Sequence, residues 1–170
     1  MDVTPPNPPQ PPEIEQAVAL LVACYLRTCK LLVCGDEGAG APIVRGLMDG
    51  VGAPRPLQPD LQARLREFGP DGVHMAARLH GALPALALAR GGSYLALAQQ
   101  VHAFGLAGDV LLAIGPGDDV GFAIQVARAK GLKSIALGRP SDLCDVVIPV
   151  AHPAVGLALC QALEAVFFPG

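Results

Sequence analysis

Apolar and polar positions along the chain form blocks whose lengths distinguish strands from helices. Residues 110–114 are an unbroken apolar run, too short for a helix and typical of a strand buried on both faces of a parallel sheet. Apolar residues then recur at helical spacing over 122–129, and Gly131 can supply the left-handed end of that helix. Residues 132–137 are then predicted to return as the next strand. Residues 108–138 therefore predict a complete βαβ unit.

The same succession of short apolar runs and helical periodicity recurs on both sides of this unit. Further strands are expected at 30–34, 83–89 and 145–150, and the middle one reads as buried. Helices are expected at 13–29, from near Pro42, at 60–68 with Asp60 as its cap, and at 72–80, 94–104 and 153–168. This alternation predicts an α/β fold, a three-layer αβα sandwich with a mostly parallel sheet of about five strands. Residues 13–170 form its single domain.

The apolar content exceeds what a solvated monomer needs. Hydrophobic residues make up 52% of the chain, charged residues only 16%, and the mean hydropathy is +0.44. The helices expected at 13–29 and 153–168 are apolar around most of their circumference, which favours packing on two sides. We therefore expect a homo-oligomer, a dimer or a tetramer, with both helices at subunit contacts.

Charge and cysteine content restrict the cellular location and the classes of partner that the sequence predicts. A net charge of −3 with 12 Lys and Arg leaves no basic face for nucleic acid. The five cysteines contain no C-x-x-C pair, which argues against a zinc site or a disulfide framework. The apolar stretch 17–26 is too short to span a membrane, and the first residues lack the pattern of a signal peptide. The expected location is the cytoplasm, without membrane association.

The first twelve residues differ from the rest in composition. Six prolines occur among the eight residues 5–12, a density that disfavours both helix and strand. Residues 1–12 are therefore interpreted as a disordered, Pro-rich leader that precedes the domain. Docking of this segment on a partner is the alternative.

Two glycine-containing loops follow predicted strands and lead into helices. Anions bind at such turns because backbone N–H groups and the helix dipole favour negative charge there. Neither loop matches a dinucleotide fingerprint or a P-loop. Asp118 and Asp119 are expected to cap the helix that follows the second loop. The candidate ligand-binding residues are Gly35, Asp36, Glu37, Gly38, Ala39, Gly115, Pro116, Gly117, Asp118, Asp119 and Val120.

Five segments, in order and spacing, carry a resemblance to a known family: residues 30–35, 83–88, 108–114, 127–137 and 144–150. With them the chain resembles the SIS (sugar isomerase) domain family, and its phosphoheptose isomerase branch in particular. The similarity extends over about 13–168. It implies the three-layer fold and a sugar phosphate as ligand. One relative of this branch binds a bacterial replication initiator, so the resemblance also implies a possible protein partner.

The loops depart from the motifs of that branch. Its first loop reads Cys-Gly-Asn-Gly-Gly-Ser, whereas residues 34–39 read Cys-Gly-Asp-Glu-Gly-Ala, which replaces the hydroxyl and adds an acid. Its second loop reads Ser-Thr-Ser-Gly-Asn-Ser and holds the sugar phosphate. Residues 115–120 read Gly-Pro-Gly-Asp-Asp-Val, with no hydroxyl and with two carboxylates. Compared with the resembling enzymes, this loop is a disabled phosphate cradle, and phosphate binding in the usual pose is expected to be opposed.

The acid and base that the resemblance implies are absent from their matching positions. The branch carries a glutamate on the helix after the first loop and a histidine on the last helix. At the place of the glutamate this chain has Met48 beside Asp49, and the only histidine near the last helix is His152, just before it. Glu37, Asp49 and His152 remain as weak catalytic candidates.

These departures favour a catalytically impaired protein that acts as a binding or regulatory module. One alternative is an active isomerase with a relocated site that uses Glu37, Asp49, Asp118, Asp119 or His152, with a divalent metal bridging the acids to phosphate. Another alternative is a structural subunit of a larger complex. No cofactor is expected, apart from that metal if the protein is active, and the residues indicate no particular metal ligands.

Overall fold

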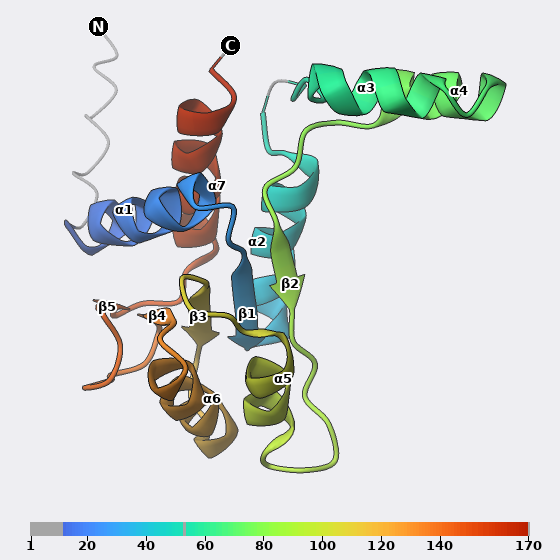
Figure 1. Cartoon of the computed structure of the whole chain (residues 1–170). Coiled ribbons are helices and arrows are strands. Elements are labelled where there is room, and N and C mark those ends of the chain that lie inside the picture. The colour runs from blue at the N-terminus through green and yellow to red at the C-terminus, as the bar shows by residue number, and fades with distance from the viewer. Residues whose placement is uncertain (1–11, 53, 170) are drawn as a thin grey trace, which may run out of the picture.

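A sheet of five parallel strands forms the centre of the molecule, in the order β2-β1-β3-β4-β5 (Figure 1). The computed structural model describes residues 12–52 and 54–169. The strands are β1 (Leu31–Gly35), β2 (Ala85–Ala87), β3 (Val110–Ile114), β4 (Lys133–Leu137) and β5 (Val146–Ile148). The expected parallel sheet of about five strands is confirmed.

Helices cover both faces of this sheet. On one side lie α1 (Pro12–Leu26), α2 (Glu37–Asp49) and α7 (Pro153–Phe167), and on the other lie α5 (Ala96–Phe104) and α6 (Asp118–Ala129). Successive side chains of β1 point to opposite faces, so Leu31 and Leu32 belong to two different cores. The expected three-layer sandwich is confirmed. Within the part of the chain that is described, no helix has both the length and the apolar character needed to cross a bilayer.

The ends of α1 differ from the expected range 13–29. The helix stops at Leu26 because Thr28 adopts a left-handed conformation, with φ of 58°. The Thr28 N–H donates to the Tyr25 carbonyl, and the Cys29 N–H donates to the Cys24 carbonyl, which closes the helix as a Schellman motif. At the other end, Pro12 begins the helix, so it does not belong to the leader. Residues 1–11 of the expected leader lie outside the described residues.

The start of α2 is also corrected. The helix begins at Glu37, and Pro42 lies inside it rather than in its first turn. Asp36 caps the helix, because its carboxylate accepts a hydrogen bond from the Gly38 N–H at 2.9 Å. This early cap outweighs the single intrahelical hydrogen bond that Pro42 cannot donate.

The strand expected at 83–89 is neither as long nor as buried as predicted. β2 spans three residues, and Leu86 at its centre is 38% exposed. The physical reason is its place in the sheet: β2 is an edge strand that pairs only with β1. An apolar run alone does not distinguish an edge strand from a central one.

Two short helices, α3 (Pro59–Arg66) and α4 (Pro70–Arg78), project from the body as an arm (Figure 1). Both begin earlier than expected, because Pro59 and Pro70 occupy the first helical turn, where proline is well tolerated. Asp60 is therefore not the cap of α3. The preceding Gln58 holds that position without a side-chain hydrogen bond.

A buried arginine fixes the chain just before this arm. Arg55 is 2% exposed, and its Nε donates to Glu164 Oε1 of α7 at 2.8 Å. Its other nitrogens donate to the carbonyls of Gly46 and Leu47 at the end of α2, and its guanidinium carbon lies 4.8 Å from the centroid of the Phe168 ring. The charge is thus paired and hydrogen-bonded, as burial requires.

We expect Arg55→Met to lower the free energy of unfolding by about 3 kcal/mol, because it leaves Glu164 partly buried without its counter-charge. Chemical denaturation measures the change. Arg45→Met, at an exposed position of α2, is the matched control and should shift stability by less than about 0.5 kcal/mol. Equal losses in the two variants would contradict a stabilising role for the Arg55 contacts.

Candidate functional site

The two predicted loops meet at one edge of the sheet. β1 and β3 are adjacent and parallel, with Gly35 opposite Ile114, so both strands end at the same level. The Asp36 N–H donates to the Ile114 carbonyl at 3.0 Å. At Gly35, φ is 106° and an added Cβ would lie 2.0 Å from the Ile114 oxygen, so this close approach requires glycine. The chain leaves β1 and β3 toward opposite sides of the sheet, which makes this edge a topological switch point.

The second loop is built differently from the expectation. The residue that precedes α6 is Gly117, and it makes no side-chain capping bond, so Asp118 and Asp119 are not caps. Both are the first residues of the helix itself, because the non-helical residue before the helix is Gly117, whose φ of 128° lies in the left-handed region that favours glycine. Asp119 Oδ1 accepts a hydrogen bond from the Val120 N–H at 2.9 Å. The carboxylates still lie at the positive end of the helix dipole.

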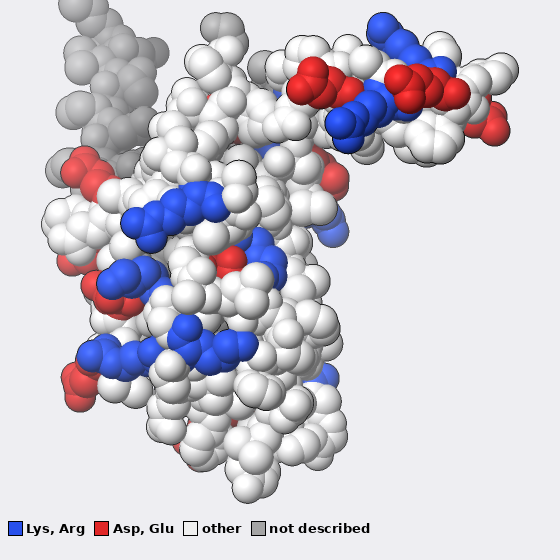
Figure 2. Space-filling view, in the orientation of Figure 1, with Lys and Arg blue, Asp and Glu red and all other residues white. Residues whose placement is uncertain are grey.

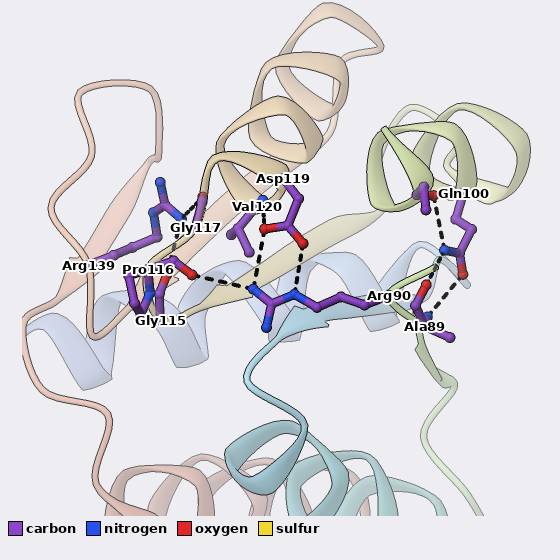
Figure 3. Close-up of polar contacts among 10 residues, drawn as sticks. Ala89, Arg90, Gln100, Gly115, Pro116, Gly117, Asp119, Val120 and Arg139 are labelled. Carbon is purple, nitrogen blue, oxygen red and sulfur yellow. Dashed lines mark hydrogen bonds and ion pairs between the residues drawn. The ribbon is translucent and has the colours of Figure 1, made fainter. Parts of the chain in front are cut away.

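Arg90, which sequence reasoning missed, lies against this loop from the end of β2 (Figure 3). Its Nε donates to Asp119 Oδ2 at 2.7 Å, and its Nη2 donates to Asp119 Oδ1 at 3.3 Å and to the Pro116 carbonyl at 3.4 Å. The guanidinium thus contacts both oxygens of the Asp119 carboxylate, one through Nε and one through Nη2. This hydrogen bond to Arg90 is the main reason why the pKa of Asp119 lies below its ordinary value of 3.8.

Arg139 approaches the same loop from the opposite side (Figure 3). It follows β4, and its Nη1 donates to the Gly115 and Gly117 carbonyls, both at 3.1 Å. The Nε of Arg139 is buried without a hydrogen-bond partner among the described residues. The three carbonyl groups of 115–117 therefore point toward guanidinium groups, and the loop carries two cations beside its two carboxylates.

A signal for both arginines was present in the sequence. Arg90 directly follows the run expected as a strand at 83–89, and Arg139 follows the run at 132–137 after one glycine. In a parallel sheet such positions lie at the edge where ligands bind. What the sequence could not supply is the strand order, which places β2 and β4 on either side of the β1–β3 pair.

The weak catalytic candidates do not converge. His152 is the cap of α7: its Nδ1 accepts a hydrogen bond from the Ala154 N–H at 3.0 Å. It lines an apolar cavity together with Gly38 and Ala39, which the sequence placed in the first loop but which lie in the first turn of α2. Glu37 lines a second cavity, between the ends of β1 and β2. Asp49 is the last residue of α2, about 18 Å from Glu37 at 1.5 Å per residue.

Two further groups bear on the chemistry of this edge. Cys34 is the next-to-last residue of β1, and burial raises the pKa of its thiol to about 12, so it is no nucleophile at neutral pH. Among residues 12–52 and 54–169, no group of three or more His, Cys, Asp or Glu side chains is close enough together to hold a metal ion.

The chain is similar in sequence to phosphoheptose isomerases over most of its length. It is 31% identical over 148 residues to the phosphoheptose isomerase of Aeromonas hydrophila subsp. hydrophila, an alignment that covers 82% of this chain and 71% of that protein. It is 28% identical over 189 residues to the phosphoheptose isomerase of Rhodospirillum rubrum, covering 90% and 85%. None of the models of known protein families matches the chain.

Solved structures agree on the fold. A phosphoheptose isomerase from Francisella tularensis superimposes with a TM-score of 0.65 at 21% identity, covering 91% of this chain and 86% of that one. The sugar isomerase domain of an RpiR transcription factor from Sphaerobacter thermophilus gives a TM-score of 0.53 at 17% identity, covering 92% and 79%. The fold is thus that of an SIS domain. With the sequence relatives, the chain belongs to the phosphoheptose isomerase-like family of SIS proteins.

We expect the Asp119 carboxyl to titrate below pH 3.8 in NMR, and Arg90→Gln to raise its pKa toward that value. Because the folded-state pKa is lowered, the pair stabilises the fold above the unfolded-state pKa and loses this contribution as the pH falls through the folded value. The contribution is at most about 1 kcal/mol, since Arg90 is 42% exposed. Arg128→Gln, at the far end of α6, is the control and should leave the Asp119 titration unchanged; equal effects of the two variants would refute the pairing.

Proposed function

We propose that this chain is a binding or regulatory SIS module that has lost isomerase chemistry, and that the Asp119 carboxylate occupies its anion site. The observation that carries the proposal is the set of partners of that carboxylate. It accepts hydrogen bonds from the Val120 N–H at the start of α6 and from two nitrogens of Arg90. A helix N-terminus and a guanidinium are the partners that a phosphate group binds.

A phosphate group entering this loop competes with groups of the protein itself. If Asp118 and Asp119 stay in place, the phosphate meets two like charges. Two unit charges about 4 Å apart repel by about 1 kcal/mol in water and by about 4 kcal/mol at the dielectric near a protein surface. Arg139 offsets part of this repulsion, but its Nη1 already donates to the carbonyls of Gly115 and Gly117. Weak phosphate binding by the unmodified loop is the expected result.

The separation of the titratable groups supports the loss of catalysis. Moving a proton between the two carbons of an aldose–ketose pair needs an acid and a base within hydrogen-bond reach of both. Asp49 lies about 18 Å along α2 from the first loop. His152 has one ring nitrogen engaged with the Ala154 N–H, and the cavity beside it is lined mainly by apolar residues. Among the candidate groups in the described part of the chain, no acid–base pair therefore faces a common substrate position.

One observation favours the second candidate function, an isomerase with a relocated site. His152 lines the same cavity as Gly38 and Ala39 at the start of α2, so an imidazole nitrogen is available beside a possible ligand position. Asp and Glu are absent from the described lining of this cavity, and no cluster of metal-ligating side chains occurs in the described part of the chain, so this candidate rests on His152 and not on a metal. This alternative requires that His152 transfers protons in addition to capping α7.

We expect no measurable isomerisation of sedoheptulose 7-phosphate, with or without Mg²⁺ or Zn²⁺, because each missing acid or base normally supplies about 10²–10⁴-fold of rate. A turnover assay on the intact protein provides the measurement. Turnover that His152→Asn abolishes would instead establish the relocated site.

We expect Asp119→Ser to raise the affinity for sedoheptulose 7-phosphate about tenfold, equivalent to about 1.4 kcal/mol, because it frees Arg90 and the Val120 N–H and adds a hydroxyl donor. Calorimetry without metal measures both proteins. Asp118→Ser removes the same charge without disturbing the Arg90 contacts and should have a smaller effect. Tight binding by the unmodified protein, unchanged in Asp119→Ser, would disprove an internally occupied anion site.

A further inference from the structure

The apolar cavity beside His152 has a volume of about 180 Å³ and lies between the first turns of α2, the first turns of α7 and the end of β4. Ile43, Leu137 and Cys160, one from each of these elements, are buried and form its floor. Leu157 is 48% exposed and lies at its mouth. The cavity is therefore a concave site with an apolar floor that opens to solvent.

Close packing of α2 against α7 fixes the shape of this cavity. An added Cβ at Gly156 would lie 2.7 Å from Ile43 Cγ1, and one at Gly46 would lie 2.8 Å from Cys160 Sγ. The Cys160 thiol also donates to the Ile43 carbonyl at 3.6 Å. The two helices are thus in direct contact along this side of the cavity. Because the walls are held by the fold itself, a ligand would bind with little rearrangement of the protein.

The lining of the cavity restricts the class of ligand that it can hold. Lys, Arg, Asp and Glu are all absent from its described residues. On the arm, by contrast, acidic and basic side chains are intermixed (Figure 2). A charged group or a row of hydroxyls placed on an apolar floor would lose its water without gaining partners, which weakens binding. The lining therefore favours an uncharged ligand with an apolar body.

His152 provides a polar group at the cavity, and its chemistry is fixed by its role as the cap of α7. Its Nδ1 accepts a hydrogen bond from the Ala154 N–H at 3.0 Å. In a neutral imidazole one ring nitrogen accepts and the other donates, so the hydrogen of His152 is carried by Nε2. Among the described residues, Nε2 has no hydrogen-bond partner. A ligand in the cavity thus meets one donor.

We propose that this cavity binds a small uncharged molecule with an apolar body and one hydrogen-bond acceptor, such as a ketone or an ester, with the acceptor on the Nε2–H of His152. The inference rests on the proposed function, a binding module, and names the class of its ligand. An apolar cavity of about 150 Å³ is large enough for benzene. One of about 180 Å³ accordingly suits a single ring that carries one small polar group.

Calorimetry of the intact protein with two probes tests the ligand class. Acetophenone has an aromatic ring and one carbonyl acceptor, and ethylbenzene has nearly the same shape without the acceptor. We expect both to bind at millimolar concentration. His152→Asn keeps an acceptor for the Ala154 N–H but lacks Nε2. It should weaken acetophenone about tenfold and change the affinity for ethylbenzene by less than about twofold.

A second pair of variants tests whether the probes occupy this cavity. Ala39→Leu places a larger apolar side chain in the lining and should weaken both probes about tenfold or more. Ala41→Leu is the matched control, because it makes the same change at an exposed position of α2 that does not line this cavity. Circular dichroism verifies that both variants are folded, and His152→Asn gives an independent result if Ala39→Leu does not fold.

The outcomes separate this inference from the proposed function. Selective loss of acetophenone affinity in His152→Asn, with loss of both probes in Ala39→Leu, supports it. Failure of the intact protein to bind either probe overturns it, as does binding that Ala39→Leu leaves unchanged. Displacement of acetophenone by sedoheptulose 7-phosphate would assign the cavity to a sugar and would also overturn it. Isomerase turnover, in contrast, refutes the binding module itself, whatever the probes do.

Discussion

The parallel pairing of β1 with β3 is the constraint on which the rest of the structure depends. Parallel strands end at the same edge, so the register that sets Gly35 opposite Ile114 also brings both glycine loops together. The flanking strands β2 and β4 deliver Arg90 and Arg139 to that edge in the same way. A single geometric rule thus gathers groups from four distant parts of the chain.

The balance of charge at this edge shapes any function it can have. The resemblance to phosphoheptose isomerases implies a loop whose hydroxyl and N–H donors face an external phosphate. Here Arg90 and the Val120 N–H face Asp119, so the donors and the anion come from the same chain. The Arg90–Asp119 pair forms without an external ligand, and it joins the segment after β2 to the start of α6.

The arm depends on the body for its position rather than for its packing. Arg55 ties the segment before the arm to α2 and α7 through Gly46, Leu47 and Glu164. The helices beyond that anchor contact mainly one another. Arg55 thus fixes the start of the arm to the body, while large apolar side chains of the arm remain exposed. An exposed apolar surface that is held in a defined orientation is suited to association with a partner.

The sequence by itself determined the α/β class, the parallel sheet and the position of both loops, because runs such as 110–114 and the spacing of 122–129 depend on neighbours along the chain. Tertiary structure alone decided that β2 is an exposed edge strand and that Asp119 pairs with Arg90 instead of capping α6. These features join segments separated by tens of residues. Their energies depend on strand order and on the exact approach of backbones, which local periodicity does not encode.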